Sequence, residues 1–294
     1  MMKAEQNDAT KTPQVQMVFK RTECKYLLND DQRARLESLM ECQGHMVGDS
    51  YGPSTVRNIY LDTPTYELAR RSEEHPYYKE KARLRSYRPV TLKMPVFVEL
   101  KKKCNGIVYK RRCTLSQDSA IALVQGELEP KTQIEREIYA TAQRLGGLSP
   151  AAYVAYDREA FYDANDRDLR MTFDRAVRVR WDHLSLASDE GERILPDGLS
   201  ILEVKTSKAM PLWLVTFLTD ERLFKTTFSK YGTAFRRRYP RGFRGLETQT
   251  VFGIRFAPEA ASGAVPTART KTVPSAPAVS LRARHVPAHA LRNA

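Results

Sequence analysis

The sequence predicts an α+β protein: a closed antiparallel β-barrel of about eight strands that forms a basic tunnel, with helices packed outside. Many segments alternate apolar and polar residues, and at least six carry Lys or Arg on the polar face. In an open sheet those like charges would face each other across neighbouring strands, which is destabilising. Several helices also need an apolar surface to cover. A barrel with its charges inside and its apolar side chains outside meets both demands.

The first half of the chain supplies the start of this pattern. Residues 18–28 look extended, and Asn29 or Asp30 is a plausible N-cap for a helix through Met40. A β-rich run at 55–61 ends in a turn signal, and a helix over 64–71 has Pro64 in its first turn. Alternation then predicts strands at 81–87, 96–103 and 107–115, with Asn105-Gly106 as a two-residue hairpin between the last two, and helices from 116 and over 132–145.

The second half repeats the pattern. We predict strands at 153–161, 169–175, 177–181 and 200–206, a helix at about 211–217 and a loop at 227–233, followed by the cluster Arg236-Arg237-Arg238. Taken alone, any one of these alternating strands is most simply explained as half-buried, with its apolar face in the core and its charges in water. Only the repetition of basic faces across strands indicates an enclosed positive interior, which focuses its field on a polyanion.

Composition limits the alternatives. The 294 residues are 41% hydrophobic and carry 48 Lys+Arg against 35 Asp+Glu, a formal net charge of +13. This excludes a wholly disordered chain and indicates an anionic partner. No apolar run approaches the ~20 residues that cross a bilayer, and the first residues lack a secretory signal, so we expect no transmembrane segment and a cytoplasmic location.

The chain divides by composition into three parts. We expect a flexible N-terminus over residues 1–16, the barrel domain over 17–256 and a disordered, basic tail over 257–294, which holds 11 Ala and 5 Pro. Most of the positive excess falls in the barrel domain. The four cysteines and five histidines form no metal-binding or nucleophile motif.

Eight short motifs, taken in order, carry a family resemblance. They are Glu23-x-Lys25-Tyr26, Tyr60-Leu61-Asp62, Lys81-x-Arg83-x-Arg85, Val98-Glu99-Leu100-Lys101, Tyr156-x-Arg158, Arg170 twelve residues on, Leu202-Glu203-Val204-Lys205 and Phe228-Ser229-Lys230-Tyr231. Together they resemble the VTC domain, the catalytic domain of the vacuolar transporter chaperone polyphosphate polymerase, within the triphosphate tunnel metalloenzyme superfamily. The resemblance covers about residues 19–238. It departs from the superfamily's ExExK signature, because Arg21 stands where the first Glu is expected.

The resemblance implies a reaction and a set of residues. The γ-phosphate of ATP would pass to a growing inorganic polyphosphate chain, with release of ADP and with Mn²⁺ or Mg²⁺ as cofactor. The implied catalytic cations are Lys25, Arg83, Arg85, Lys101, Arg158, Arg170 and Lys230. The implied substrate-binding residues are Lys110, Arg112, Tyr156, Lys205 and Ser229. Glu203 would ligate the metal, and Glu23 would be a second ligand or an ion-pair partner.

Two further functions stay open at this point. The same fold could hydrolyse triphosphate or polyphosphate, or bind polyphosphate without turnover. Nucleic acid is not expected as a partner, because the charges follow strand faces rather than one exposed stripe next to Tyr77 and Tyr78. A membrane protein that receives the product also stays open as a partner.

Overall fold

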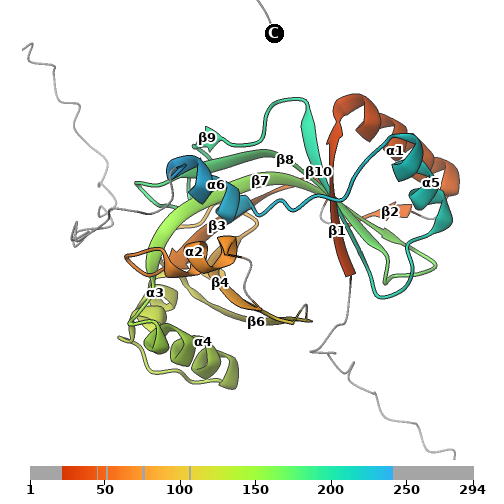
Figure 1. The fold of residues 1–294 in the computed structure, drawn as a ribbon. Coiled ribbons are helices and arrows are strands. Elements are labelled where there is room, and N and C mark those ends of the chain that lie inside the picture. Colours follow the sequence, from red (N-terminus) through yellow and green to blue (C-terminus); the bar gives the residue numbers. More distant parts are fainter. Residues whose placement is uncertain (1–21, 45, 51, 75–76, 106, 241–294) are drawn as a thin grey trace, which may run out of the picture. The chain divides into compact units, whose positions relative to one another are not determined.

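The computed structural model describes residues 22–44, 46–50, 52–74, 77–105 and 107–240. They form an antiparallel sheet with flanking helices (Figure 1), which confirms the α+β class. The strands are β1 (Thr22–Asn29), β2 (Met46–Gly48), β3 (Ser54–Asp62), β4 (Tyr78–Ser86), β5 (Pro95–Cys104), β6 (Ile107–Ser116), β7 (Ser149–Asp163), β8 (Arg170–Arg180), β9 (Glu192–Arg193) and β10 (Leu199–Thr206). The helices are α1 (Asp30–Gln43), α2 (Glu67–Glu73), α3 (Gln117–Gln125), α4 (Gln133–Arg144), α5 (Leu212–Asp220) and α6 (Lys230–Arg238).

The sheet is open, so the predicted closed barrel is wrong. Its strand order is β1-β10-β8-β7-β3-β4-β5-β6, and within the described ranges β1 and β6 are its two unjoined edges. At the β1 edge, the segment between α5 and α6 takes the place of a closing strand, because the backbone N–H of Thr226 donates to the carbonyl of Lys25 at 2.8 Å. The sheet nevertheless curls: Lys101 on β5 approaches Glu23 on β1 to 3.8 Å, although five strands lie between them in the sheet.

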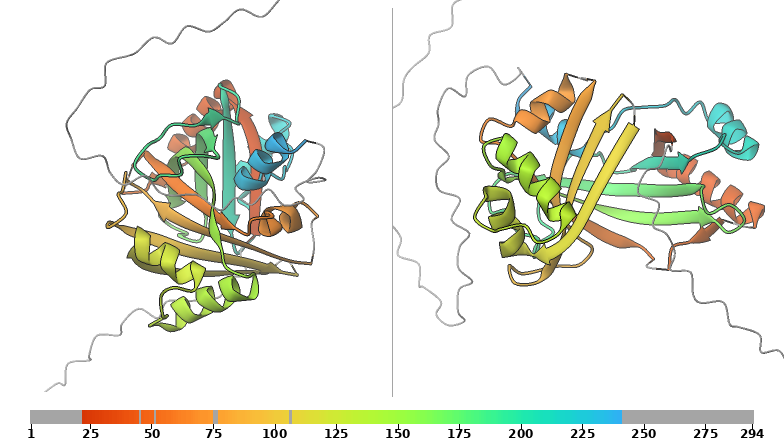
Figure 2. Two further views of the ribbon diagram at one scale, coloured as in Figure 1. Left: turned by 90° about the vertical axis from the view of Figure 1, so that its left-hand side faces the viewer. Right: turned by 90° about the horizontal axis from the view of Figure 1, so that it is seen from below.

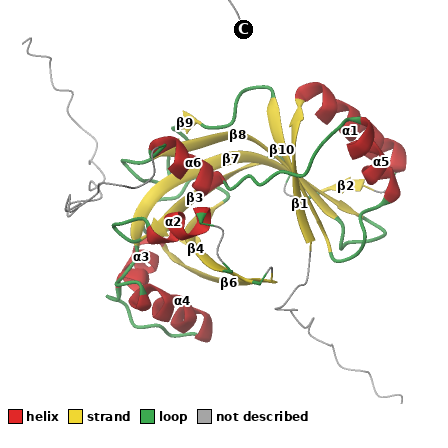
Figure 3. Cartoon of the chain, viewed as in Figure 1, coloured by secondary structure: helices red, strands yellow, loops and turns green. Residues whose placement is uncertain are grey.

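Helices cover the outer face of the curled sheet at two places (Figures 2 and 3). α3 and α4 pack on β3, β4, β5 and β7, and α1 and α5 pack on β1, β8 and β10, each over its own apolar cluster. These two clusters confirm that apolar side chains point outward beneath helices. A third cluster lies on the inner face, where Val154, Val177 and Val179 pack against Phe235 of α6. The inner face is therefore part charged and part apolar.

A bulge in β8 produces the change from a charged to an apolar inner face. The two strands predicted at 169–175 and 177–181 are one strand, in which Ala176 has φ 47° and the pairing with β7 shifts register. Because an extra residue exchanges the two faces of a strand, Asp174 points inward before the bulge and Val177 points inward after it. Arg178 consequently points outward, where it pairs with Asp157 at 3.0 Å.

Local sequence signals account for several element boundaries. Asn29 and Thr132 form capping boxes at the starts of α1 and α4, and β5 and β6 pair in antiparallel register as far as Cys104 and Ile107. α2 begins three residues later than predicted, because the buried carboxylate of Asp62 accepts the backbone N–H groups of Leu68 and Ala69 at 2.8 and 3.0 Å.

The largest local error concerns the loop predicted at 227–233, which contains the first turn of α6. The predicted N-terminus 1–16 and tail 257–294 lie outside the described residues. Among the described helices, none has the length and apolar character needed to cross a membrane.

Candidate functional site

The inner face of the curled sheet gathers ten basic side chains and four carboxylates. They come from alternate positions of seven strands and from the start of α6, so cross-strand neighbours share this face. The basic residues are Lys25, Lys81, Arg83, Arg85, Lys101, Lys110, Arg112, Arg158, Lys205 and Lys230, and the acidic residues are Glu23, Glu99, Asp174 and Glu203. Eleven of the twelve basic or polar residues predicted for catalysis or substrate binding thus lie on this face or, like Ser229 and Tyr156, directly against it.

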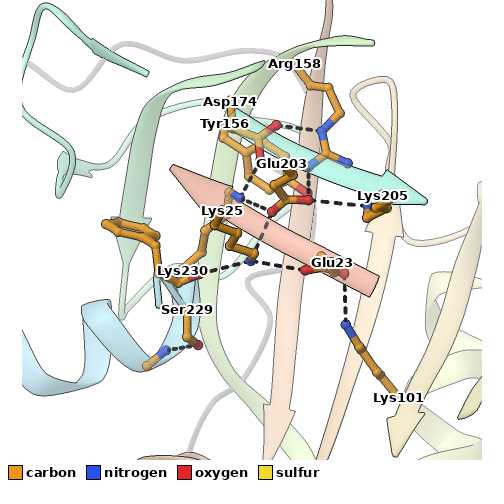
Figure 4. A network of polar contacts seen from close by, with 12 residues as sticks. Glu23, Lys25, Lys101, Tyr156, Arg158, Asp174, Glu203, Lys205, Ser229 and Lys230 are labelled. Atoms are coloured by element: carbon orange, nitrogen blue, oxygen red, sulfur yellow. Dashed lines mark hydrogen bonds and ion pairs between the residues drawn. The ribbon is translucent and has the colours of Figure 1, made fainter. Parts of the chain in front are cut away.

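Glu203 on β10 is the hub of one half of the site (Figure 4). Its carboxylate lies 3.1 Å from Lys25, 3.3 Å from Arg158 and 3.4 Å from both Lys205 and Lys230. Burial opposes ionisation, but the charges of Lys230 and Lys25 hold the pKa of Glu203 well below its usual range. Glu203 is therefore an ionised carboxylate that positions four cations around one point.

Asp174 on β8 completes this half of the site. Its side chain is fully buried, accepts two hydrogen bonds from Arg158 at 2.6 and 2.7 Å and pairs with Lys230. Sequence analysis did not select Asp174, although it shares a predicted strand face with Arg170 and Thr172. The alternation of this strand was the available signal for Asp174.

Glu99 on β5 organises the other half. Arg83 donates to it at 2.8 Å and Arg112 at 2.7 Å, and Lys110 lies 2.9 Å away. Despite burial, Arg83 and its neighbours hold the pKa of Glu99 far below the usual range. Arg85 also approaches Glu99, at 3.8 Å.

Arg85 connects the Glu99 half of the site to β3 and β7. It donates to the side-chain oxygen of Asn58 at 2.9 Å and to the Tyr156 hydroxyl at 3.1 Å. Tyr156 also lies beneath the Lys230 ammonium, 4.4 Å from ring centroid to nitrogen. Tyr156 therefore touches both halves of the site as a hydrogen-bond and ring partner of two cations.

The start of α6 points into the site. Ser229 caps the helix by accepting from the Gly232 N–H at 3.1 Å, and Lys81 donates to the same hydroxyl at 2.7 Å. Lys25 donates to the carbonyl of Phe228 at 3.0 Å. Because a helix N-terminus carries partial positive charge, α6 adds to the positive potential of this face. Lys81 belongs to the Lys81-x-Arg83-x-Arg85 motif, but it was not among the site residues predicted from the sequence.

Tyr60 and Lys81 have unusual acidities. Burial raises the pKa of Tyr60, but the charges of Arg83, Lys81 and Arg85 outweigh it and lower that pKa to about 8. Burial, with repulsion from Lys101, lowers the pKa of Lys81 to about 8. Both groups therefore titrate just above neutral pH.

Arg170 lies apart from the paired cations. It pairs in register with Lys205, which places it at the rim of the same face, but it is exposed and donates to the Arg167 carbonyl at 3.5 Å. The structure thus brings Arg170 near the site's edge without joining it to the ion-pair network.

The described residues contain no group of three or more His, Cys, Asp or Glu side chains suited to a metal ion. Glu203 and Glu23 both approach the ammonium of Lys25, at 3.1 and 3.4 Å. Mg²⁺ is commonly held by one or two carboxylates together with substrate phosphates, so this pair fits a metal shared with phosphate and not one held by protein alone.

The fold and this face define a class of protein: a curled antiparallel sheet with a positive inner face, which attracts polyanions. The model of the VTC domain family matches residues 20–239, and the chain belongs to that family. No curated protein matches the chain in a sequence comparison.

Several solved structures resemble the chain at low identity. An adenylyl cyclase candidate from Hippeastrum, described as having a dominant triphosphatase activity, is 15% identical with a TM-score of 0.46, over 74% of this chain and 95% of that one. Adenylate cyclase candidates from Bacillus halodurans (14%, TM-score 0.39, 78% and 91%) and Vibrio parahaemolyticus (12%, TM-score 0.41, 73% and 97%) also match.

Proposed function

We propose that this chain is an ATP–polyphosphate phosphotransferase, which moves the γ-phosphate of ATP onto a growing inorganic polyphosphate chain. The observation that supports it is the convergence of ten basic side chains on one face, against four carboxylates. Phosphoryl transfer mainly requires alignment of the phosphates and neutralisation of their charge. Donor and acceptor are both polyanions, so a surplus of cations is needed to bring them together.

The residues divide by the contacts that their chemistry allows. Arginine offers planar, bidentate contacts to phosphate and lysine a compact charge. The proposed phosphate ligands are Lys25, Arg83, Arg85, Lys101, Arg158, Arg170 and Lys230, with Lys110, Arg112, Tyr156, Lys205 and Ser229 as further substrate contacts. The attacking group would be a terminal phosphate oxygen of the chain. Because that oxygen is already ionised, the site needs no strong general base.

Glu203 and Glu23 are the residues that would hold a divalent cation, Mn²⁺ or Mg²⁺, together with phosphate oxygens. Such an ion neutralises charge on the phosphates. For Glu203 to take part, it must exchange some of its contacts with Lys25, Lys205, Lys230 and Arg158 for the ion. Incoming phosphate makes this exchange feasible, because it supplies those cations with new partners.

Incubation of the purified chain with ATP and Mn²⁺ tests the proposal. Polyphosphate chains with ADP as the second product support it. Orthophosphate without chains would identify a hydrolase instead, and tight ATP binding without products would identify a binding module. A cytoplasmic location and a membrane-protein partner stay predictions of the sequence.

The Arg83→Ala variant gives a residue-level test. We expect polymer synthesis to fall at least about 100-fold, because Arg83 is one of the central cations and charged contacts in a dry site are worth several kcal/mol. The fold should persist, since Glu99 keeps Lys110 and Arg112 as partners. The rate of ADP release and a thermal melt measure both effects.

Arg111→Ala is the matched control. Arg111 is adjacent to Arg112 on β6 but turns to the outer face, where it donates to Glu137 at 2.5 Å. Arg111→Ala removes the same charge from the same sheet, on β6 instead of β4, but from its outer face, so synthesis should stay within about twofold of wild type. Equal activity in the two variants would refute the assignment of Arg83.

A further inference from the structure

Five lysines continue the positive face toward the β5–β6 hairpin. In the sheet register Lys81 lies opposite Lys101, and Lys101 lies opposite Lys110; two residues farther along, Lys79 lies opposite Lys103. Side chains directly opposite each other share a face and have Cβ atoms about 5 Å apart. The five lysines therefore share one face of the sheet, in rows that begin in the candidate site and end near the start of β4 and the end of β5.

Lys79 and Lys103, the outer lysine pair, have no ion-pair partner among the described residues. In the described ranges neither side chain forms an ion pair, and Glu73 attracts Lys79 only from beyond ion-pair distance. The neighbouring carboxylate, Glu80, lies on the other face of β4, where Lys102 is 3.6 Å away. Burial, and then repulsion from Lys103, lowers the pKa of Lys79. Nothing in the described part of the chain neutralises this pair.

On the same three strands, a neighbouring set of residues that lie opposite one another contains an acid between its two cations. Two residues from the Lys81 row, Arg83 and Arg112 flank Glu99, so an acid separates the two cations. The lysine rows have no acid at the corresponding position. Like charges opposite each other destabilise a sheet, so this arrangement fits a face whose counter-charge is an external anion.

We infer that the outer lysine pair is a subsite for the distal phosphates of a polyphosphate chain, outside the central site. This inference rests on the proposed function. It identifies where the polyphosphate chain would enter or leave the central site. Rows two residues apart are separated by about 6.8 Å along the strand, so successive phosphates of one chain can pass from Lys81 and Lys101 to Lys79 and Lys103. A lysine ammonium suits this contact, because it binds phosphate as a point charge without a fixed geometry.

The subsite predicts a dependence on chain length. A triphosphate held at the central cations is too short to occupy the outer lysine pair as well, whereas a long polyphosphate covers both. The experiment measures the affinity of the full chain for tripolyphosphate and for long-chain polyphosphate, in wild type and in the K79A/K103A double variant. We expect long-chain affinity to fall about fivefold or more in the variant, with tripolyphosphate affinity unchanged within twofold.

The control is K93A/K131A, which removes the same two charges from exposed lysines in the β4–β5 and α3–α4 connections. It should bind both ligands like wild type. Thermal melts without ligand check the fold: K79A/K103A should melt no lower than wild type, because it removes a repulsion.

The outcomes separate the subsite from the proposed function. Unchanged long-chain affinity in K79A/K103A overturns the subsite while leaving the central site standing. An equal loss of both ligands also overturns it, because the two lysines would then belong to the central site. If the wild-type chain binds neither ligand, the proposed function fails and the subsite fails with it.

Discussion

Lys230 and Asp174 show how a residue in this site serves folding and binding together. Their side chains are only 7% and 0% exposed, and they form an ion pair with each other. Without Lys230, Asp174 would keep Arg158 as a cationic partner, so the cost should fall below the ~3–5 kcal/mol of a buried charge left with no partner. Replacement of Lys230 would therefore destabilise the fold as well as remove a phosphate ligand. Arg83 is the better probe of catalysis, because its partner Glu99 would retain three cations, Arg85, Lys110 and Arg112, whereas Asp174 would retain Arg158.

Lys81 and Tyr60 carry the pH dependence predicted at this scale. Both have a pKa of about 8 in the folded chain. Above that pH Lys81 becomes neutral and Tyr60 becomes negative, and each change weakens attraction for a polyanion. We expect the affinity for tripolyphosphate to fall with each pH unit above 8, by up to about tenfold for each of the two groups, as measured by titration calorimetry.

Without ligand, the free energy of unfolding should increase as the pH rises, whereas the affinity for tripolyphosphate decreases. The ordinary pKa values of Lys81 and Tyr60 are 10.5 and 10.0, so the unfolded chain keeps these two protons longer than the folded chain does. These groups therefore make the free energy of unfolding rise between about pH 8 and 10. The double variant K81R/Y60F should flatten both curves. Persistence of the full affinity decline in that variant would contradict the assignment.

Among the elements, α6 decides how the site is assembled. It covers the apolar part of the inner face with Phe235 and presents Ser229 and Lys230 to the charged part. A Cβ on Gly232 would collide with the Glu73 carboxylate and come within 2.9 Å of the Ser229 hydroxyl oxygen. Glycine at this position thus allows α6 to sit close to the end of α2.

We expect Gly232→Ala to lower both stability and synthesis. Alanine improves helix propensity by about 1 kcal/mol, but overpacking costs about 1–3 kcal/mol, so the steric effect should prevail and displace Ser229 and Lys230. Urea unfolding and the rate of polymer formation measure the two effects. Gly48→Ala is the control, since its Cβ would meet nothing within 4 Å. A Gly232→Ala variant as active and stable as wild type would show that α6 has room to shift.

Elements with a strong local signal were predictable from sequence, and α6 was not. The capping boxes at Asn29 and Thr132 and the turn at Asn105 act within a few residues, so they are visible in the chain itself. Ser229 is also a good N-cap, but the glycine and the three arginines that follow obscured the helix. Its apolar side, carried by Tyr231, Ala234 and Phe235, matters only once an inner apolar surface exists to receive it.

At the scale of the whole molecule, the sequence predicted which side chains share a face of the sheet, but it did not predict whether the sheet closes into a barrel. Alternation fixes which residues share a strand face, so most of the basic residues predicted for the site do meet on the inner face. Closure depends on what pairs with the β1 edge, and there a backbone hydrogen bond from Thr226 competes with any closing strand. The bulge at Ala176 was likewise invisible, because alanine carries no signal for a positive φ.

The surplus of positive charge on one face leads to a prediction for the chain as a whole. Without an anion, repulsion among the inner-face cations opposes folding. Tripolyphosphate at about a hundred times its Kd should add about 2.7 kcal/mol to the free energy of unfolding. For a domain of this size that corresponds to a rise in Tm of about 5–10 °C, measurable by differential scanning calorimetry.

Two comparisons distinguish site binding from general screening of charge. Sodium chloride at matched ionic strength should raise Tm much less, because it screens exposed charges without bridging the buried ones. Arg83→Ala should lose most of the tripolyphosphate effect, while Arg111→Ala, whose side chain pairs with Glu137 on the outer face, should keep it. If salt and tripolyphosphate raise Tm equally in all three proteins, the inner face attracts anions only diffusely. The arrangement around Glu203 and Glu99 would then organise the sheet without forming a phosphate site.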